Sequence, residues 1–262
     1  MNRLPGPADH VVINGKRMYI DAQDARGAAI ARAGGVLHPV AGALWRAVVA
    51  DDRWDAVVDV GANYGEMLLA AELPPGAKVV AVEPNERLVP YLRRTLAESL
   101  PGTRLQQVAV SDLSGEAVFH DDLTWWGNST LCQEWVADRP HAWTTTTVKT
   151  VRLDEVLDLL GVLPGMRVAM KLDIEGLEPR VLRDGLARLR TLRHAKVMVE
   201  AVRLTAEEYD WLLDHFHVWY FDVDQAALVR VHDGASGAAL RRRLGSPGVY
   251  ARDVVVAPAV LS

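Results

Sequence analysis

Short apolar runs alternate with helical periodicity along most of this chain. From residue 57 onward, buried-strand patterns occur at 57–60, 78–82, 104–110, 167–172 and 196–199, separated by helical patterns at 65–72, 85–99, 153–160 and 178–188. A helical pattern at 205–215 and strand patterns at 218–223, 227–231 and 253–256 follow. Strands that alternate with helices indicate a doubly wound α/β sheet, here parallel with an antiparallel hairpin at its C-terminal end.

Two segments lie outside this alternation. Residues 1–50 contain a strand pair around Asn14-Gly15 and two helical patterns, so we expect a cap laid against the mouth of the sheet, with the core at 51–262. Residues 113–150 interrupt the core with two strand patterns and a long connection, which predicts an inserted hairpin. A chain of 262 residues is long enough for one large domain with such additions and too short for two full-sized domains.

Aromatic residues gather in the inserted segment. Four of the eight tryptophans, at positions 125, 126, 135 and 143, fall in its long polar connection. Aromatic side chains in a polar loop favour a substrate lid, and a small satellite core beneath the loop is the alternative. The candidate substrate-binding residues are Trp125, Trp126, Asn128 and Ser129.

The stretch VVDVGANYGEM at 57–67 carries the clearest chemistry. An apolar run stops at Gly61, and a helical pattern starts at Glu66, so the stretch predicts a buried strand, a tight turn and a helix N-terminus. Glycines at 61 and 65 allow a sharp turn and close approach of a ligand. Glu83 ends the next strand, 22 positions after Gly61, where a carboxylate is placed to accept hydrogen bonds from both ribose hydroxyls. These features predict a nucleoside site.

The same turn indicates which nucleoside binds. A dinucleotide turn has the pattern G-x-G-x-x-G, but here Asn63 and Glu66 occupy the second and third glycine positions. A carboxylate at the helix start repels a pyrophosphate and is compatible with a ligand that carries an ammonium and a sulfonium. The turn therefore favours S-adenosylmethionine over NAD.

A second acidic edge follows the strand at 167–172. The carboxyl end of this strand carries three charged residues, Lys171, Asp173 and Glu175. Open α/β sheets bind ligands at this edge. Charges clustered there are energetically costly unless they contact a ligand, a metal or a substrate proton. Asp173 and Glu175 are candidate catalytic residues, followed by His38, which lies in the loop that enters the second helical pattern. We expect no dedicated metal site, although a divalent cation held by these carboxylates stays open.

Composition excludes several other classes of protein. The net charge is −5 without a long basic run, so the chain lacks the footprint of a nucleic-acid-binding protein. Cys132 is the only cysteine, which excludes an internal disulfide and a cysteine-based zinc site. No apolar run approaches the roughly 20 residues that cross a bilayer, and the N-terminus has no signal core, so we expect a soluble, cytoplasmic protein.

Taken together, these motifs resemble those of the FkbM family of S-adenosylmethionine-dependent methyltransferases. The similar pieces are VVDVGANYGE at 57–66, VEPN at 82–85, AVSD at 109–112, VRLDEVL at 151–157, KLDIEGLE at 171–178 and VMVE at 197–200. The resemblance implies a class I, Rossmann-like α/β fold with a seven-stranded sheet, and S-adenosyl-L-methionine as cofactor. It assigns cofactor contacts to Asp59, Gly61, Asn63, Gly65, Glu83 and Asp112, to which the motifs add Glu66, Pro84, Ser111 and Asp173.

The expected reaction is methylation of a hydroxyl in a small natural product, such as a sugar or a polyketide of secondary metabolism, antibiotic biosynthesis included. A small-molecule acceptor is left by exclusion, because nucleic acid and membrane are not indicated; the oligomeric state, a homodimer included, stays open. Three alternatives remain: N-methylation of a small amine or amino sugar, a nicotinamide-dependent oxidoreductase, and a catalytically inactive nucleoside-binding protein.

Overall fold

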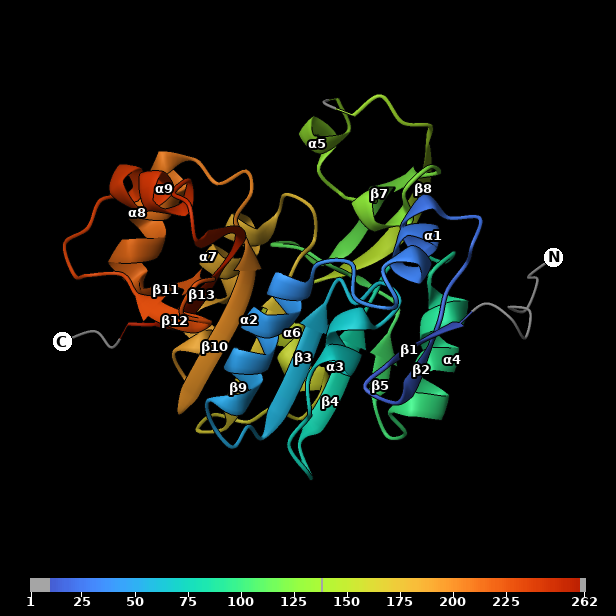
Figure 1. Ribbon diagram of the computed structural model, residues 1–262, viewed down its shortest axis with the longest axis horizontal. Helices are drawn as coiled ribbons and strands as arrows, with labels where there is room; N and C mark the ends of the chain where they lie inside the picture. Colours follow the sequence, from blue (N-terminus) through green and yellow to red (C-terminus); the bar gives the residue numbers. More distant parts are fainter. Residues whose placement is uncertain (1–9, 138, 260–262) are drawn as a thin grey trace.

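The computed structural model describes residues 10–137 and 139–259, and its centre is a mixed sheet (Figure 1). Within these residues the sheet has eight strands in the order β12-β11-β13-β10-β9-β3-β4-β5. Their bounds are β3 Ala56–Val60, β4 Lys78–Val82, β5 Arg104–Gln106, β9 Arg167–Leu172, β10 His194–Glu200, β11 Phe216–Asp222, β12 Ala227–Arg230 and β13 Val249–Pro258. The five strands from β10 to β5 are parallel, and β13 runs antiparallel between β10 and β11. The expected parallel sheet with an antiparallel end is confirmed. It has eight strands where the resemblance implied seven, and β12 lies at the strand pattern expected at 227–231.

Helices cover both faces of this sheet. Successive residues of a strand point to opposite faces, so Val57 packs in one core and Val58 in the other. One face is covered by α2 (Pro39–Ala50), α3 (Glu66–Ala70) and α4 (Val89–Ser99), and the other by α6 (Leu153–Leu159), α7 (Glu178–Leu189) and α8 (Ala206–His215), on which α9 (Gly237–Leu244) packs. Burial on both faces explains the nearly continuous apolar runs of β3 and β9.

The N-terminal part divides between a hairpin and the core. Strands β1 (His10–Ile13) and β2 (Lys16–Tyr19) pair through a turn at Asn14 and Gly15, which both have positive φ, as a two-residue hairpin requires. The hairpin lies beside α4 with α1 (Ala25–Arg32), whereas α2 lies on the sheet and buries Trp45 completely (Figure 1). Residues 1–9 lie outside the described part, and a domain boundary near residue 50 stays a prediction.

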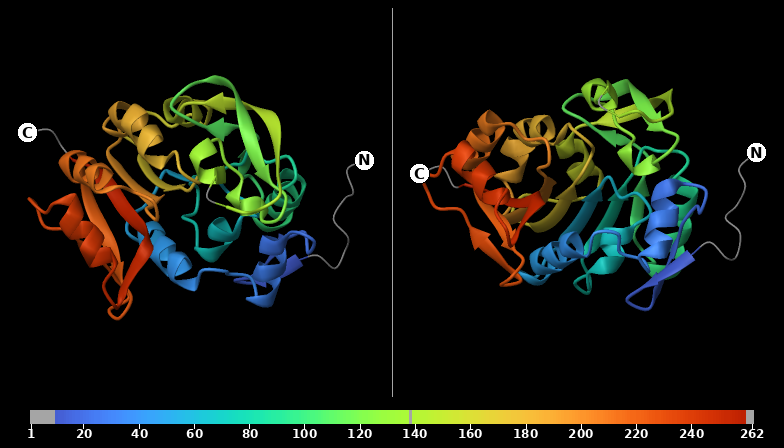
Figure 2. Two further views of the ribbon diagram at one scale, coloured as in Figure 1. Left: turned by 90° about the horizontal axis from the view of Figure 1, so that it is seen from above. Right: turned by 45° about the horizontal axis from the view of Figure 1, so that its top comes forward.

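The inserted segment forms a second sheet above the carboxyl ends of the main strands (Figure 2). This sheet has the order β6-β8-β7, and its elements are β6 Ala109–Val110, β7 Gly115–Asp122, η1 Trp126–Asn128, α5 Gln133–Ala137 and β8 Trp143–Val151. The strand expected at 104–110 is therefore divided, because β5 pairs with β4 in the main sheet and β6 pairs with β8 in the second one. The expected inserted strand pair is present as β7 and β8.

No helix in the described ranges is long and apolar enough to cross a membrane.

Candidate active site

A cavity opens between the carboxyl ends of the central strands and the inserted segment. It encloses about 1110 Å³, including the part that is open to solvent. Its walls come from the turn after β3, the end of β4, the loop after β9, the end of β10, the start of β13, the N-terminal helices and the inserted segment. Segments that are far apart in the sequence therefore meet at one place, at the edge where open α/β sheets bind ligands.

The turn after β3 has a conformation that depends on glycine. Gly61 has a φ of +79°, and a Cβ at this position would lie 1.8 Å from the backbone oxygen of Asp173. Gly65 has a φ of +91° and caps the N-terminus of α3, while Asn63 lies between them with a φ of +52°. Gly61, Asn63 and Glu66 line the cavity, and Gly65 shapes the turn without lining it.

Glu83 forms the acidic wall at the end of β4. Its side chain is 5% exposed, Oε2 accepts a hydrogen bond from the Asn63 N–H at 2.8 Å, and Oε1 accepts one from the Asn85 N–H at 2.9 Å. Burial raises the pKa of Glu83 to about 7. Each carboxylate oxygen retains a lone pair for a ligand. Beside it the cavity wall is apolar, formed by Val82, Pro84, Val108, Val110, Phe119 and Leu131.

Ser111 and Asp112 were expected to contact the cofactor, but the structure does not place them among the residues that line the cavity. Arg180 on α7 binds the Asp112 carboxylate through two nitrogens, at 3.1 and 2.8 Å from Oδ2, and this ion pair holds the carboxylate. The Ser111 hydroxyl donates to Asp112 at 3.1 Å. The Asp112 carboxylate is therefore bound by other residues of the fold and does not line the cavity.

Lys171 lines the cavity and joins two of the predicted acids, Asp173 in the wall and Asp59 behind it. Its Nζ lies 3.1 Å from Asp173 Oδ2, 3.6 Å from Asp59 Oδ1 and 3.3 Å from the Gly61 carbonyl oxygen. Asp59 is completely buried, accepts no hydrogen bond from a described residue and does not line the cavity. Burial raises the pKa of Asp59 to about 6, although the Lys171 ammonium opposes this shift. Lys171 is thus the counterion that both carboxylates share.

An acidic edge lies on the opposite side of the cavity from Glu83. Oxygen atoms of Asp173, Glu175 and Glu200 lie within 4.8 Å of one another, and oxygen donors of this kind are the ligands of Mg²⁺. Each of these carboxylates, however, already has a basic partner. The ion pairs are Asp173 with Lys171 at 3.1 Å, Glu175 with Arg139 at 3.4 Å and Glu200 with Arg252 at 3.0 Å. The structure therefore gives no separate support to a divalent cation.

The three candidate catalytic residues all line the cavity, but their environments differ. Burial raises the pKa of Asp173, but the Lys171 ammonium outweighs this and holds it below its ordinary value. Burial, together with the charge of Asp173, raises the pKa of Glu175 to about 8. Burial and the guanidinium groups of Arg252 and Arg26 hold the pKa of His38 below 6.5. At neutral pH His38 is therefore an uncharged base, and its ring makes no hydrogen bond with a described residue.

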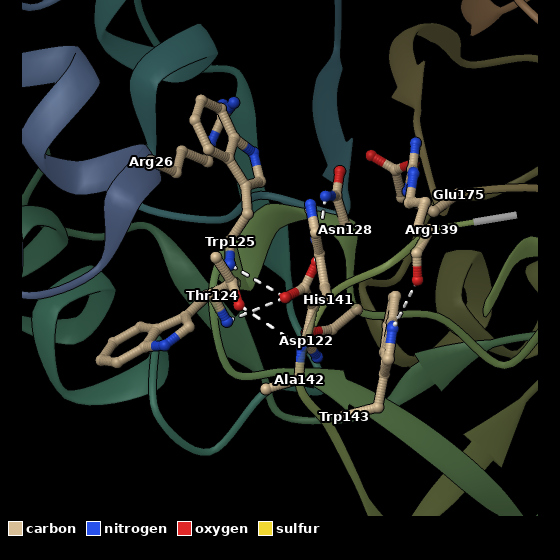
Figure 3. Close-up of polar contacts among 12 residues, drawn as sticks. Arg26, Asp122, Thr124, Trp125, Asn128, Arg139, His141, Ala142, Trp143 and Glu175 are labelled. Carbon is tan, nitrogen blue, oxygen red and sulfur yellow. Dashed lines mark hydrogen bonds and ion pairs between the residues drawn. The ribbon is translucent and has the colours of Figure 1, made fainter.

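The inserted segment contributes only part of its predicted binding set. Trp126 and Ser129 line the cavity, whereas Trp125 and Asn128 do not. Figure 3 shows Trp125 and Asn128 on the buried carboxylate of Asp122, which accepts from the Trp125 N–H and the Asn128 amide, both at 3.0 Å. These two residues therefore fix the loop that carries Trp126 and Ser129.

Trp135 fits the alternative of a satellite core. It is 3% exposed, and the guanidinium groups of Arg139 and Arg203 each lie 4.2 Å from its ring centre. Trp143 donates its indole N–H to the Arg139 carbonyl (Figure 3). Because Arg139 also pairs with Glu175, this small cluster attaches the inserted segment to the acidic edge.

Several residues that line the cavity were missed by the sequence analysis: Arg26, Tyr250, Arg252 and Asp253. Arg26 lies in a helical pattern without a motif, and no local signal marks it. Asp253 pairs in register with Glu200 across β10 and β13. The sequence did predict a strand at 253–256. Had it been paired antiparallel with 196–200, Arg252 and Asp253 would have been expected beside Glu200, at the carboxyl edge of the sheet.

We expect the protein to lose stability as the pH rises from about 4 to about 7.5, that is, from the unfolded to just above the folded pKa values of its buried carboxyl groups. Burial raises the pKa of Glu83, Glu178 and Asp253 to about 7 each, whereas in the unfolded chain these groups have ordinary, lower values. A raised pKa in the folded state contributes stability at low pH that is lost as the pH passes the folded value. Urea unfolding at fixed ionic strength should give a lower free energy of unfolding at the higher pH; an equal or higher value would contradict this assignment. Glu178→Gln should reduce the slope.

Comparisons with known proteins now place the chain in a family. No curated protein matches it. Structural matches include precorrin-6y C5,15-methyltransferase from Geobacter metallireducens (14% identity, 84% of this chain and 87% of that chain, TM-score 0.42). They also include Aeropyrum pernix fibrillarin with natively bound S-adenosyl-L-methionine (11%, 84% and 74%, 0.41) and the O-methyltransferase TomG of Streptomyces achromogenes (14%, 84% and 80%, 0.38).

These superpositions are weak, and the assignment rests on the sequence match. The model of the FkbM methyltransferase domain matches residues 59–224, which is more than half of the 262 residues. The match covers the turn after β3, Glu83 and the acidic edge as far as Glu200. The chain therefore belongs to the FkbM family of S-adenosylmethionine-dependent methyltransferases.

Proposed function

We propose that the protein methylates a hydroxyl oxygen of a small, polar natural product, such as a sugar or a polyketide alcohol. The observation that carries this proposal is the uncharged, hydrogen-bond-free imidazole of His38 in the wall of the cavity. A hydroxyl holds its proton tightly near neutral pH, so its oxygen needs a base as the new bond forms. His38 supplies such a base.

The residues of the cavity fit the family's cofactor. Glu83 retains lone pairs for two ribose hydroxyls, and the apolar wall beside Pro84 and Phe119 suits a purine base. Gly61 and Asn63 would lie along the methionyl part, next to the acidic edge. When bound, S-adenosylmethionine supplies an electrophilic methyl group on a sulfonium. This chain's own residues hold the acceptor in line, exclude water and take up the acceptor's proton.

The structure favours a different order of base candidates from the one that the sequence favoured. Asp173 is ionised, but Lys171 neutralises it and its low pKa makes it a weak base. Glu175 binds Arg139 and, with a pKa of about 8, carries a proton through much of the neutral range. His38 is both deprotonated and free, so we assign it the role of base and give Asp173 and Glu175 the role of positioning the reacting groups.

We assign acceptor contacts to Trp126 and Ser129 in the inserted segment. The Ser129 hydroxyl oxygen accepts from the Asp122 N–H and from the Asn85 amide, both at 3.1 Å. A hydroxyl has two lone pairs and one proton, so its proton is left to donate into the cavity. Trp126 offers an apolar face on which a sugar or ring can lie.

N-methylation of a small amine is the second candidate. The acidic edge, with Asp253 beside Glu200, lines the cavity with carboxylates, and such a wall attracts a positively charged acceptor. An amine acceptor would bind here as an ammonium and would have to lose a proton before transfer. The same base would then serve either acceptor.

The test uses S-adenosylmethionine with a carbon-13-labelled methyl group. Matched acceptors that carry a hydroxyl or an amine at the same sugar position are incubated with the protein, and the product is examined by NMR and mass spectrometry. The chemical shift of the labelled carbon distinguishes a methyl on oxygen from one on nitrogen. Methyl on oxygen supports the proposal, whereas methyl on nitrogen overturns the hydroxyl assignment. S-adenosylhomocysteine binding without turnover on any acceptor would favour an inactive binding protein.

Glu83→Ala should weaken cofactor binding about a hundredfold. The variant removes a carboxylate that accepts charge-assisted hydrogen bonds, each worth about 1.5 to 3 kcal/mol. Calorimetric titration with S-adenosylhomocysteine measures the change, and Glu86→Ala, which removes an exposed carboxylate three residues further on, serves as the control. Binding by Glu83→Ala within about threefold of wild type would remove the ribose assignment.

A further inference from the structure

Arg26 is a cavity residue whose side chain is fixed before any ligand binds. It lies in the first turn of α1, where the Asp24 side chain accepts hydrogen bonds from the Arg26 N–H at 3.2 Å and the Gly27 N–H at 3.0 Å. The same carboxylate accepts from the Tyr64 hydroxyl at 2.8 Å and the Trp126 N–H at 3.0 Å. The start of α1 is thereby attached both to the turn after β3 and to the inserted segment.

The guanidinium of Arg26 has hydrogen-bonding capacity to spare. Nε donates to Asn63 Oδ1 at 3.1 Å, and Nη2 donates to Glu66 Oε2 at 3.0 Å. A guanidinium has five N–H donors, so three of them, including both on Nη1, have no acceptor among the residues that the structure describes. The side chain is 18% exposed and lines the cavity. The unused donors are therefore available to a ligand beside Asn63.

The cofactor's carboxylate needs a cation, and the three basic side chains in the wall, which all pair with a carboxylate, differ in where they lie. Lys171 directs its ammonium to Asp173, Asp59 and the Gly61 carbonyl. Arg252 pairs with Glu200 on the acidic edge. Arg26 lies on the cofactor side, because its partners Asn63 and Glu66 belong to the turn after β3 and to the start of α3.

We propose that Arg26 binds the α-carboxylate of the cofactor's methionyl group. Arg26 and Glu66 form an ion pair at 3.0 Å, which offers a cation and an anion side by side. An α-amino acid carries the opposite pair, a carboxylate next to an ammonium, so the two pairs are complementary. Glu66 Oε1 is held by the Leu37 N–H at 2.6 Å, which fixes the acidic half.

This assignment brings a residue from outside the matched domain into the cofactor site. Residues 59–224 match the family model, whereas Arg26 belongs to the N-terminal helices that precede it. Tight packing supports a fixed position: a Cβ on Gly127 would lie 2.5 Å from Arg26 Cδ. The proposal concerns the cofactor alone, so it does not depend on which acceptor the enzyme uses.

The test compares two ligands that differ only in the carboxylate. They are S-adenosylhomocysteine and its decarboxylated analogue S-adenosyl-3-thiopropylamine, titrated calorimetrically into the full chain. Wild type should prefer S-adenosylhomocysteine about ten- to a hundredfold, the range for charge-assisted hydrogen bonds. Arg26→Gln should lower this preference to within about threefold while binding the analogue nearly as wild type does. Arg26→Lys, which keeps the charge but loses the planar fork, should retain part of the preference.

Arg32→Gln is the matched control, because Arg32 is an exposed arginine at the other end of the same helix. It should keep the full preference, and melting temperatures verify that each variant is folded. The proposal is overturned if wild type does not prefer the ligand with the carboxylate, a result that needs no variant. It is also overturned if Arg26→Gln keeps the preference, or if it weakens both ligands equally, since Arg26 would then only support Asn63 and Glu66.

Discussion

Lys171→Met should lower the free energy of unfolding by about 3 to 5 kcal/mol near neutral pH. Lys171 is 6% exposed and is the shared counterion of Asp59 and Asp173. Methionine fills a similar volume but removes the charge. Asp59, which is completely buried and has no hydrogen bond with a described residue, would then carry an uncompensated charge. Urea or guanidinium unfolding measures the loss.

The pH dependence of this loss identifies its cause. Without Lys171, the pKa of Asp59 rises above its wild-type value of about 6, so the variant regains stability relative to wild type as the pH falls and Asp59 takes up a proton. Adding Asp59→Asn should restore part of the loss at neutral pH. Lys196→Met is the control, since Lys196 is 7% exposed on the adjacent strand but pairs with Asp51 near the surface. An equal loss in both lysine variants, independent of pH, would contradict the shared-counterion account.

His38→Gln should lower kcat about 10² to 10⁴-fold, the usual contribution of a general base, while S-adenosylhomocysteine binds as in wild type. Wild-type activity should fall on the acid side, below pH 6.5, as the imidazole takes up a proton. This acid limb should disappear in the variant. Rates of methyl transfer across pH 5 to 9, at saturating cofactor, give both results.

Two comparisons show whether His38 is the base. His232→Gln replaces an exposed histidine and should keep the wild-type rate. Glu175→Gln tests the competing candidate at the acidic edge. If Glu175→Gln loses more activity than His38→Gln and removes the acid limb, Glu175 is the base and the assignment of His38 is wrong.

The sequence predicted the fold well where the local pattern determines the structure. The runs around Val57 and Met170 are apolar on both faces, so they indicated buried parallel strands, and Gly61 marked the turn between strand and helix. The pattern at 104–110 was misleading because it was taken as one strand, whereas β5 and β6 pair in different sheets. The partner of a strand is determined by contacts with residues far away in the sequence, and a short apolar pattern does not specify it.

The candidate site was predicted where a residue's position in a strand fixes its direction. Glu83 and Asp173 follow buried strands, so both were expected at the carboxyl edge, and both line the cavity. Asp112 was expected there on the same grounds, but Arg180, 68 residues away, binds its carboxylate. Arg26 was missed because only the packing of α1 against the turn brings it to the cavity.

A crystal structure of the protein with S-adenosylhomocysteine tests the central claim most directly. The account predicts the ribose hydroxyls on Glu83, the homocysteine carboxylate on Arg26, and the sulfur on the side of the cavity that His38 and Asp173 line. A ligand bound elsewhere, or one whose ribose lies away from Glu83, would contradict it.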